Sequence, residues 1–237
     1  MSENKYDIYL SFDYFELNIS ALDRINGKII CNIKKNYKNF FSQNSELNHE
    51  TLKIPVEQSI MDIEKLSGKF VKDIFLMIQT PESISIQISV LKKNDEKKIY
   101  KKDVTYLIQD AKQQVINSNP ELSIIHIIVK NYRLNNNDYE FLPLDLNCEN
   151  FSIDIEFICF PKNLTMKFKD FFLSQHILIN KFICSNYAKK FYSQNANKNI
   201  CELGYDIVSG INKQEVVSVP KITAKKGFFE KLFHIFD

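Results

Sequence analysis

The sequence lacks any long apolar stretch. No run reaches the roughly 18–20 residues that a helix needs to span a bilayer. The segment Met1–Asp7 is polar and contains no signal-peptide core. These two absences predict a protein that remains in the cytoplasm.

An excess of charge of one sign is also missing. The net charge is +2, and 25% of the residues are charged. A nucleic-acid-binding protein usually carries a strong basic excess, so we expect no nucleic-acid partner. The hydrophobic fraction of 44% is ordinary for a folded soluble protein. A chain of 237 residues is long enough for one large domain or two small ones.

The cysteines and histidines form no cluster with the spacing of metal ligands. The cysteines are odd in number and include no C-x-x-C pair. They are Cys31, Cys148, Cys159, Cys184 and Cys201, and the histidines are His49, His126, His176 and His234. Cys159 and Cys184 lie inside apolar runs, which predicts reduced cysteines in the core. We therefore expect no metal site.

Motifs of catalysis are missing as well. No nucleophile–base pair, glycine-rich loop or carboxylate cluster stands out in the sequence. We interpret Asp13, Glu16, Asp138 and Asp145 as solvated charges at turns and strand edges. The sequence therefore favours a protein that is not an enzyme.

The first third of the chain has the pattern of strands followed by a helix. Asn26-Gly27 is a strong hairpin signal between two of these strands. A helix is predicted from four apolar residues at helical spacing, and Ser67-Gly68 supplies its end. The expected strands are Tyr6–Phe12, Leu17–Leu22, Lys28–Ile33 and Ile74–Ile78, and the helical residues are Val56, Ile60, Ile63 and Leu66.

The pattern of residues 82–160 predicts a separate small unit of strands and one helix. Strict alternation of apolar and polar residues predicts half-exposed strands, and Asp103 can cap the helix. The strands are Ile84–Val90, Ser123–Val129 and Phe151–Phe157, and Lys92–Lys98 is expected to be a charged turn. Two helices and two strands are predicted after this unit. The helices are Leu164–Leu173 and Ser185–Phe191, and the strands are Ile177–Cys184 and Ile200–Val208. A flexible linker is predicted at Asn212–Ala224.

The segment Lys225–Asp237 has the pattern of an amphipathic helix. Four phenylalanines on one face, flanked by lysines, are typical of a helix that lies at a membrane interface. The predicted membrane-binding residues are Lys225, Lys226, Phe228, Phe229, Lys231, Leu232, Phe233, Ile235 and Phe236. Two alternatives remain open: the helix docks on the protein's own core, or it docks into a partner's groove.

The order of these elements resembles FtsA, the actin-like membrane tether of the bacterial cell-division ring. Ile54–Ile78 resembles the family's helix-then-strand segment, and Tyr100–Lys112 resembles its next helix. Ile125–Ile128 resembles the strand that follows, and Phe228–Phe233 resembles the terminal membrane-targeting helix. The resemblance implies an α/β fold: one half of an actin-like fold (residues 1–81 and 161–210) with an inserted 1C or SHS2-like subdomain at residues 82–160. A linker at 211–224 and the helix at 225–237 follow.

The sequence departs from this family at its nucleotide site. The family's phosphate hairpin corresponds to Ser11, Phe12, Asp13 and Tyr14, with Asp13 at the glycine position and Tyr14 at the hydroxyl position. Glycine lets the backbone approach phosphate closely, and an Asp would repel it. The second phosphate loop has at most a remnant at Gly204–Gly210, and the chain lacks the length of the second half. We therefore expect a degenerate site without a cofactor.

The resemblance implies a peripheral membrane tether or scaffold at the division septum, on the cytoplasmic face of the inner membrane. Its partners would be the membrane surface and cell-division proteins, either FtsZ or downstream components, with self-association as a further option. A second hypothesis is a cytoplasmic scaffold of a pilus or secretion assembly, like the related PilM proteins. PilM-like proteins usually lack the terminal helix, which favours the division hypothesis.

Overall fold

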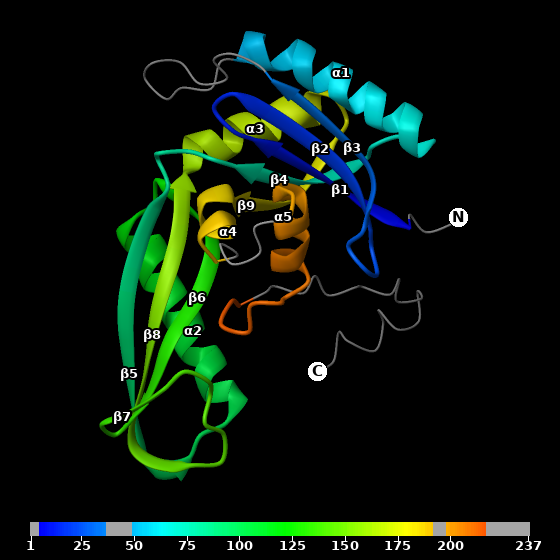
Figure 1. The fold of residues 1–237 in the computed structure, drawn as a ribbon. Coiled ribbons are helices and arrows are strands. Elements are labelled where there is room, and N and C mark those ends of the chain that lie inside the picture. Colours follow the sequence, from blue (N-terminus) through cyan, green and yellow to red (C-terminus); the bar gives the residue numbers. More distant parts are fainter. Residues whose placement is uncertain (1–4, 37–48, 192–197, 217–237) are drawn as a thin grey trace, which may run out of the picture.

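The computed structural model describes residues 5–36, 49–191 and 198–216. Within these ranges the chain forms two sheets; four helices pack against the first, and one helix covers a face of the second (Figure 1). None of the helices in this part of the chain is long and apolar enough to cross a membrane. The predicted membrane-binding residues 225–237 lie outside the described residues.

The first sheet has five strands in the order β3-β2-β1-β4-β9. The strands are β1 (Tyr6–Phe12), β2 (Glu16–Asp23), β3 (Ile29–Asn36), β4 (Asp73–Ile78) and β9 (Leu178–Cys184). The first three form an antiparallel meander, while β4 and β9 run parallel to β1. Strand β1 is buried from Ile8 to Phe12 on both of its faces. Such a continuous apolar strand requires helices on both sides of the sheet.

Helices cover both faces of the first sheet, as Figure 1 shows. On one face lie α1 (His49–Ser67) and α3 (Lys162–Ser174); on the other lie α4 (Ser185–Phe191) and α5 (Ile200–Val208). Helix α1 buries Val56, Ile60 and Ile63 at the predicted helical spacing. Leu66, predicted in the same stripe, is 63% exposed in the last turn of the helix, which ends at Ser67.

Residues 200–208 form helix α5, so the predicted strand at this position is wrong. The physical reason lies at its start, where Asn199 and Glu202 form a capping box. The Asn199 side chain accepts the Cys201 backbone N–H at 2.7 Å, and Glu202 Oε2 accepts the Asn199 backbone N–H at 2.9 Å. Leu203 and Ile207, one turn apart, are buried against the sheet.

The hairpin predicted at Asn26-Gly27 joins β2 to β3. Gly27 has φ +68°, a conformation that L side chains rarely adopt. A Cβ atom at Gly27 would lie 2.4 Å from the ring of Tyr205, whose hydroxyl donates a hydrogen bond to the Ile25 carbonyl at 3.0 Å. Gly27 therefore permits both the turn and the packing of α5 beneath it.

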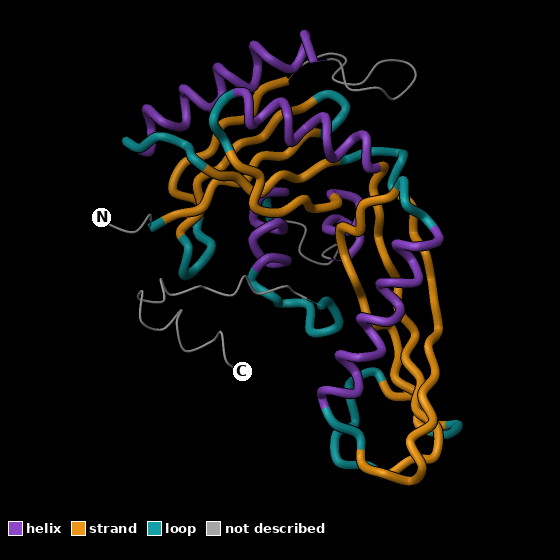
Figure 2. The backbone as a smooth tube through the Cα atoms, turned by 180° about the vertical axis from the view of Figure 1, so that it is seen from behind, coloured by secondary structure: helices purple, strands orange, loops and turns teal. Residues whose placement is uncertain are grey.

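The second sheet is made from residues between β4 and α3 and has its own hydrophobic cluster. Its antiparallel strands have the order β5-β8-β6-β7. They are β5 (Ile84–Lys98), β6 (Leu122–Leu134), β7 (Asn137–Tyr139) and β8 (Asn147–Pro161), and α2 (Lys101–Ser118) packs on one face. Figure 2 shows this unit as an elongated arm that projects from the first sheet. Asp103 caps α2 from the third helical position, where it accepts the Tyr100 backbone N–H at 2.9 Å.

Lys92–Lys98 continues strand β5, which corrects the predicted charged turn. Lys92 and Lys93 pair with β8, and pairing resumes at Lys97 after an irregularity in register. Asp95 and Glu96 have φ angles of 49° and 58° at this point. A bulge therefore accommodates the polar residues without ending the strand.

Residues 211–216 correct the predicted linker at 211–224. Asn212 and Glu215 are buried, and Glu215 forms a β-bridge with Ile128 of β6. Burial of these side chains shows that this part of the segment belongs to the folded body. The remainder of the predicted linker, 217–224, lies outside the described residues.

Candidate functional site: a groove between the two sheets

The turn after β1 holds the residues expected at a degenerate phosphate site. Ser11 and Phe12 are buried at the end of β1, and Asp13 and Tyr14 follow in the turn. Asp13 Oδ1 accepts the Tyr14 backbone N–H at 2.6 Å, while Lys189 Nζ lies 3.0 Å from Asp13 Oδ2. An amide and an ammonium are the groups that hold anions in proteins. Here the Asp13 carboxylate binds both the Tyr14 amide and the Lys189 ammonium.

A polar cavity of about 360 Å³ opens beside this turn. It is lined by Ser11, Asp13, Glu16, Asn18, Asn32, Lys34, Lys189, Asn199 and Ile200. Asn199 Oδ1 accepts from Asn18 Nδ2 at 3.4 Å, and Asn199 Nδ2 donates to Asn32 Oδ1 at 3.3 Å. Much of the hydrogen-bonding capacity of this cavity is therefore used within the protein.

Gly204, predicted as a remnant of the second phosphate loop, lies inside helix α5. A Cβ at this position would lie 2.6 Å from Met77 Sδ and 3.1 Å from Tyr9 Cδ1. The glycine thus permits close packing of the helix on the sheet. Gly204 lies within α5, where the backbone amide bonds to a carbonyl of the same helix.

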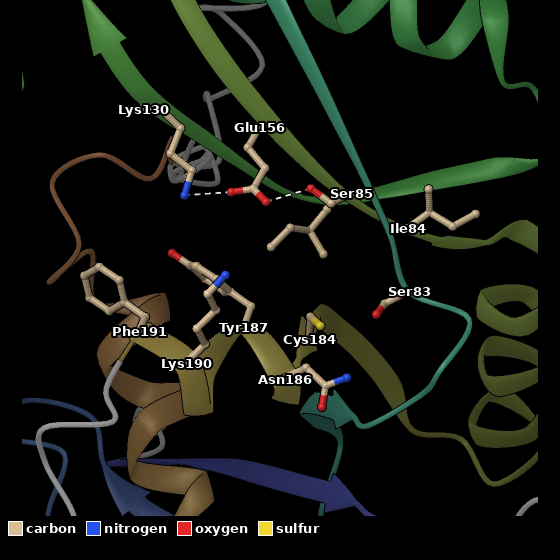
Figure 3. Close-up of a pocket in the computed structure, with 11 residues that line it drawn as sticks. Ser83, Ile84, Ser85, Lys130, Glu156, Cys184, Asn186, Tyr187, Lys190 and Phe191 are labelled. Carbon is tan, nitrogen blue, oxygen red and sulfur yellow. Dashed lines mark hydrogen bonds and ion pairs between the residues drawn. The ribbon is translucent and has the colours of Figure 1, made fainter.

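A second cavity of about 440 Å³ lies between α4 and the second sheet, and we call it the groove (Figure 3). It is lined by Ser83, Ile84, Ser85, Lys130, Glu156, Ile158, Cys184, Asn186, Tyr187, Lys190 and Phe191. Strands β5, β6 and β8 contribute one wall, and the end of β9 with α4 contributes the other. The groove therefore forms only where the two units meet.

The groove combines apolar surface with charged groups. Lys130 Nζ lies 2.7 Å from Glu156 Oε2, and Ser85 Oγ donates to Glu156 Oε1 at 2.6 Å (Figure 3). Burial on its own raises the pKa of Glu156, but the hydrogen bonds from Lys130 and Ser85 outweigh it and lower the pKa. Glu156 is therefore an anion with its two oxygens engaged. Lys190 reaches into the groove from α4.

A buried polar cluster lies behind the wall formed by Tyr187. His126 Nδ1 is 2.8 Å from Glu215 Oε1, and Tyr187 donates its hydroxyl proton to Glu215 Oε2 at 2.9 Å. The Cys184 backbone N–H donates to His126 Nε2 at 2.9 Å. Because Nε2 accepts, the proton of a neutral His126 must be on Nδ1, where it donates to Glu215.

Burial sets the ionisation of His126 in this cluster, and the neighbouring groups set that of Glu215. Burial lowers the pKa of His126 despite the neighbouring carboxylate. Burial raises the pKa of Glu215, but the hydrogen bond from His126 and the Lys181 ammonium outweigh it, and the net shift is downward. We therefore assign a neutral imidazole beside an ionised carboxylate.

The prediction that Cys159 and Cys184 lie in the core is confirmed, since both are buried. All five cysteines are free thiols. Burial raises the pKa of Cys159 to about 11. Among the described residues, no group of three or more His, Cys, Asp and Glu side chains could hold a metal ion.

Sequence reasoning missed the groove and the polar cluster. His126 and Glu215 are 89 positions apart, and neither belongs to a motif. The one available signal was polarity inside an apolar strand: His126 lies between Ile125 and Ile127 and is 1% exposed. A buried polar side chain needs a partner, but the sequence does not say which.

No model of a known protein family matches the sequence, and no curated protein sequence matches it. Several solved structures nevertheless match the fold of this chain. A chain of the PilM-PilN type IV pilus biogenesis complex is 8% identical, with a TM-score of 0.50, and the match covers 80% of this chain and 50% of that one.

Two further solved structures match less well. The cytoplasmic domain of EpsL, from the type II secretion system of Vibrio cholerae, has 9% identity, a TM-score of 0.34, and coverage of 77% and 57% of the two chains. A Bacteroides thetaiotaomicron protein with an actin-like ATPase fold has 9% identity, a TM-score of 0.35, and coverage of 81% and 56%. The chain spans about half the length of the solved chains that it matches.

These observations define the class of the fold. A three-stranded antiparallel meander continues into parallel strands, helices cover both faces, and a second small sheet is inserted after β4. This is one half of an actin-like fold, the fold class that the resemblance implied. At 8% identity the match to the PilM-PilN chain shows the fold alone, so membership of the FtsA family stays a prediction.

Proposed function

We propose that this protein is a scaffold that binds a segment of a partner protein in the groove and does not use nucleotide. The observation that supports it is the groove itself: about 440 Å³ with apolar walls and two lysines at its margin. Such a cavity is large enough for one or two side chains of an extended peptide. Because Glu156 pairs with Lys130, Lys190 is the cation of the groove that favours a segment carrying an acidic group.

The solved likeness supports the choice of a protein partner. The PilM-PilN structure is a complex of two proteins in pilus biogenesis, and EpsL is an inner-membrane component of a secretion system. We therefore place a scaffold of a membrane-associated pilus or secretion assembly first. This reverses the order of the two hypotheses that the sequence alone suggested.

A photo-crosslinking residue at Phe191 is expected to capture one defined partner in cells. Ile84→Asp should reduce the yield about tenfold or more, because it places a charge in an apolar wall. Leu91→Asp, on the same strand but outside the groove and 65% exposed, is the matched control and should leave the yield unchanged. Equal losses with both variants, or with neither, would contradict a partner site in the groove.

The absence of nucleotide binding rests on Asp13. Its carboxylate engages the Tyr14 amide and Lys189, so an incoming phosphate would meet a negative charge. Titration with Mg-ATP should give no saturable binding, measured by calorimetry. A dissociation constant in the micromolar range would overturn this part of the proposal.

Cell division is the second candidate function, and the sequence of residues 225–237 favours it. The order of motifs along the chain resembles FtsA, whose terminal helix targets a membrane. The partners in that case are FtsZ, downstream division proteins or a second copy of this chain. A fluorescent fusion separates the two candidates: a midcell band supports division, and polar foci support a pilus or secretion assembly.

Membrane binding through residues 225–237, on the cytoplasmic face of the inner membrane, belongs to the division candidate and is also compatible with a pilus or secretion scaffold. Vesicles with anionic lipid should float the native chain, because each buried Phe contributes roughly 1.5–3 kcal/mol. Phe229→Asp combined with Phe233→Asp should leave the protein in the bottom fraction. Glu230→Gln, on the opposite face of the predicted helix, should still float. If the double Asp variant floats as well as the native chain, the tail is not the membrane anchor.

A further inference from the structure

The described chain ends in a short segment, Asn212–Val216, that is paired to the second sheet. The Val129 backbone N–H donates to the Gln214 carbonyl at 2.8 Å, and the Val216 N–H donates to the Ile127 carbonyl at 2.8 Å. These bonds occupy the stretch of the β6 edge that β7 leaves unpaired, because β7 pairs only with Tyr132–Leu134. The segment therefore extends the second sheet although it follows the last helix of the first unit.

One side chain of this segment joins the two units. Glu215 contacts His126 from β6, Tyr187 from α4 and Lys181 Nζ from β9, the last at 3.5 Å. Its side chain is 1% exposed. Asn212 Nδ2 adds a hydrogen bond to the Tyr187 hydroxyl at 2.7 Å. A buried carboxylate with three partners on three elements fixes the relative position of those elements.

The same contacts reach the groove wall. Tyr187 and Cys184 line the groove, and both are held from behind: Tyr187 by Glu215 and Asn212, and Cys184 by His126. The His126 and Tyr187 rings also pack with centroids 4.6 Å apart. Displacement of Glu215 would leave a buried imidazole N–H and a buried hydroxyl without their acceptor, which is costly. The wall must then rearrange.

We infer that Asn212–Val216 is a latch that sets the shape of the groove, so that displacement of this segment changes the affinity for a partner. This regulation rests on the proposed function of the groove, although the latch itself can be tested without a partner. The hydrogen-exchange rates of two backbone amides measure whether the latch is in place. The Val129 amide bonds to the latch, and the Cys184 amide bonds to His126, which the latch holds.

Amide hydrogen exchange of the full chain tests the latch. Glu215→Ala should raise the exchange rates of the Val129 and Cys184 amides about tenfold or more. Lys213→Ala, an exposed change in the same segment, should leave both rates unchanged. Asn212→Ala should raise them less, because Tyr187 keeps its bond to Glu215. Unchanged rates in both the Glu215 and Asn212 variants would overturn the latch.

Thiol alkylation supplies an internal control within one molecule. Cys184 lines the groove, whereas Cys201 lies in the core of the first unit, where its Sγ is 3.6 Å from the Tyr9 carbonyl. With N-ethylmaleimide, Glu215→Ala should accelerate modification of Cys184 alone. Equal acceleration at Cys201 would mean that the whole fold loosens, and this result would also overturn the latch.

The crosslinking experiment separates the latch from the proposed function. Glu215→Ala should change the crosslinking yield at Phe191, while Lys213→Ala should not. If the native protein captures no partner, the groove proposal fails, but amide exchange still decides whether the latch exists.

Discussion

Phe168→Ala is expected to lower the free energy of unfolding by about 3–5 kcal/mol. Phe168 lies on α3 and is fully buried, and its ring packs on Phe12 at the end of β1 with centroids 5.5 Å apart. The substitution removes most of a large side chain from a close-packed core, and such cores relax only partially around the space left behind. Because α3 follows the second sheet in sequence, Phe168 joins two parts of the chain that are far apart.

Chemical denaturation measures this loss. The midpoint in urea should fall, while the slope should stay close to the native value. Phe141→Ala is the matched control: Phe141 is 57% exposed, and its loss should change stability by no more than about 0.5 kcal/mol. We propose that residues 1–81 and 161–210 share one core. Equal effects of the two substitutions would contradict that division of the chain.

Local sequence patterns predicted the elements whose signals are local. Asn26-Gly27 marks the hairpin because only a residue tolerant of positive φ fits there, and Gly27 has φ +68°. The stripe of Val56, Ile60 and Ile63 matches a helix packed on one side. The order of such elements carried the resemblance to FtsA, and that resemblance implied the half actin-like fold.

Secondary structure was hardest to predict from the sequence in short apolar segments. Ile200–Val208 has only nine residues and is apolar enough for either a strand or a helix. The deciding signal is the pair Asn199 and Glu202, which is visible in the sequence as a capping box. At Lys92–Lys98 the charges indicated a turn, but the pairing of β5 with β8 overrides that local preference.

The groove could not be predicted because its residues come from five elements and from the loop before β5. Ser83, Lys130 and Phe191 have no common spacing or motif, and only the docking of the two units brings them together. The latch was missed for a related reason. Asn212–Val216 is polar, and polar residues before a proline favour a linker, yet Glu215 is buried by partners that follow from the tertiary fold.

Acidification from about pH 7.5 to about pH 5 is expected to destabilise the junction of the two units through His126. Burial holds the folded-state pKa of His126 below its ordinary value of 6.5. At a pH between the folded-state pKa and the unfolded-state pKa of about 6.5, His126 binds more protons in the unfolded chain than in the folded chain. The contribution of His126 to stability is therefore complete above about pH 6.5 and declines as the pH falls toward the folded-state pKa.

The groups that face His126 define the pH window. Glu215, Lys181 and the backbone of Cys184 surround it, with Tyr187 packed on its ring. The folded-state pKa of Glu215 is below its ordinary 4.5, so its own contribution is lost only at more acidic pH. A decline between about pH 6.5 and about pH 5 therefore reports the imidazole.

His126→Gln provides the comparison for this pH dependence. A glutamine amide can accept the Cys184 N–H and donate to Glu215, yet it does not titrate. The free energy of unfolding, measured in urea at each pH, should decline more steeply in the native protein than in the variant. Parallel curves would show that His126 does not control the junction. Since protonated His126 can no longer accept from Cys184, the Cys184 amide should lose protection in the same pH range.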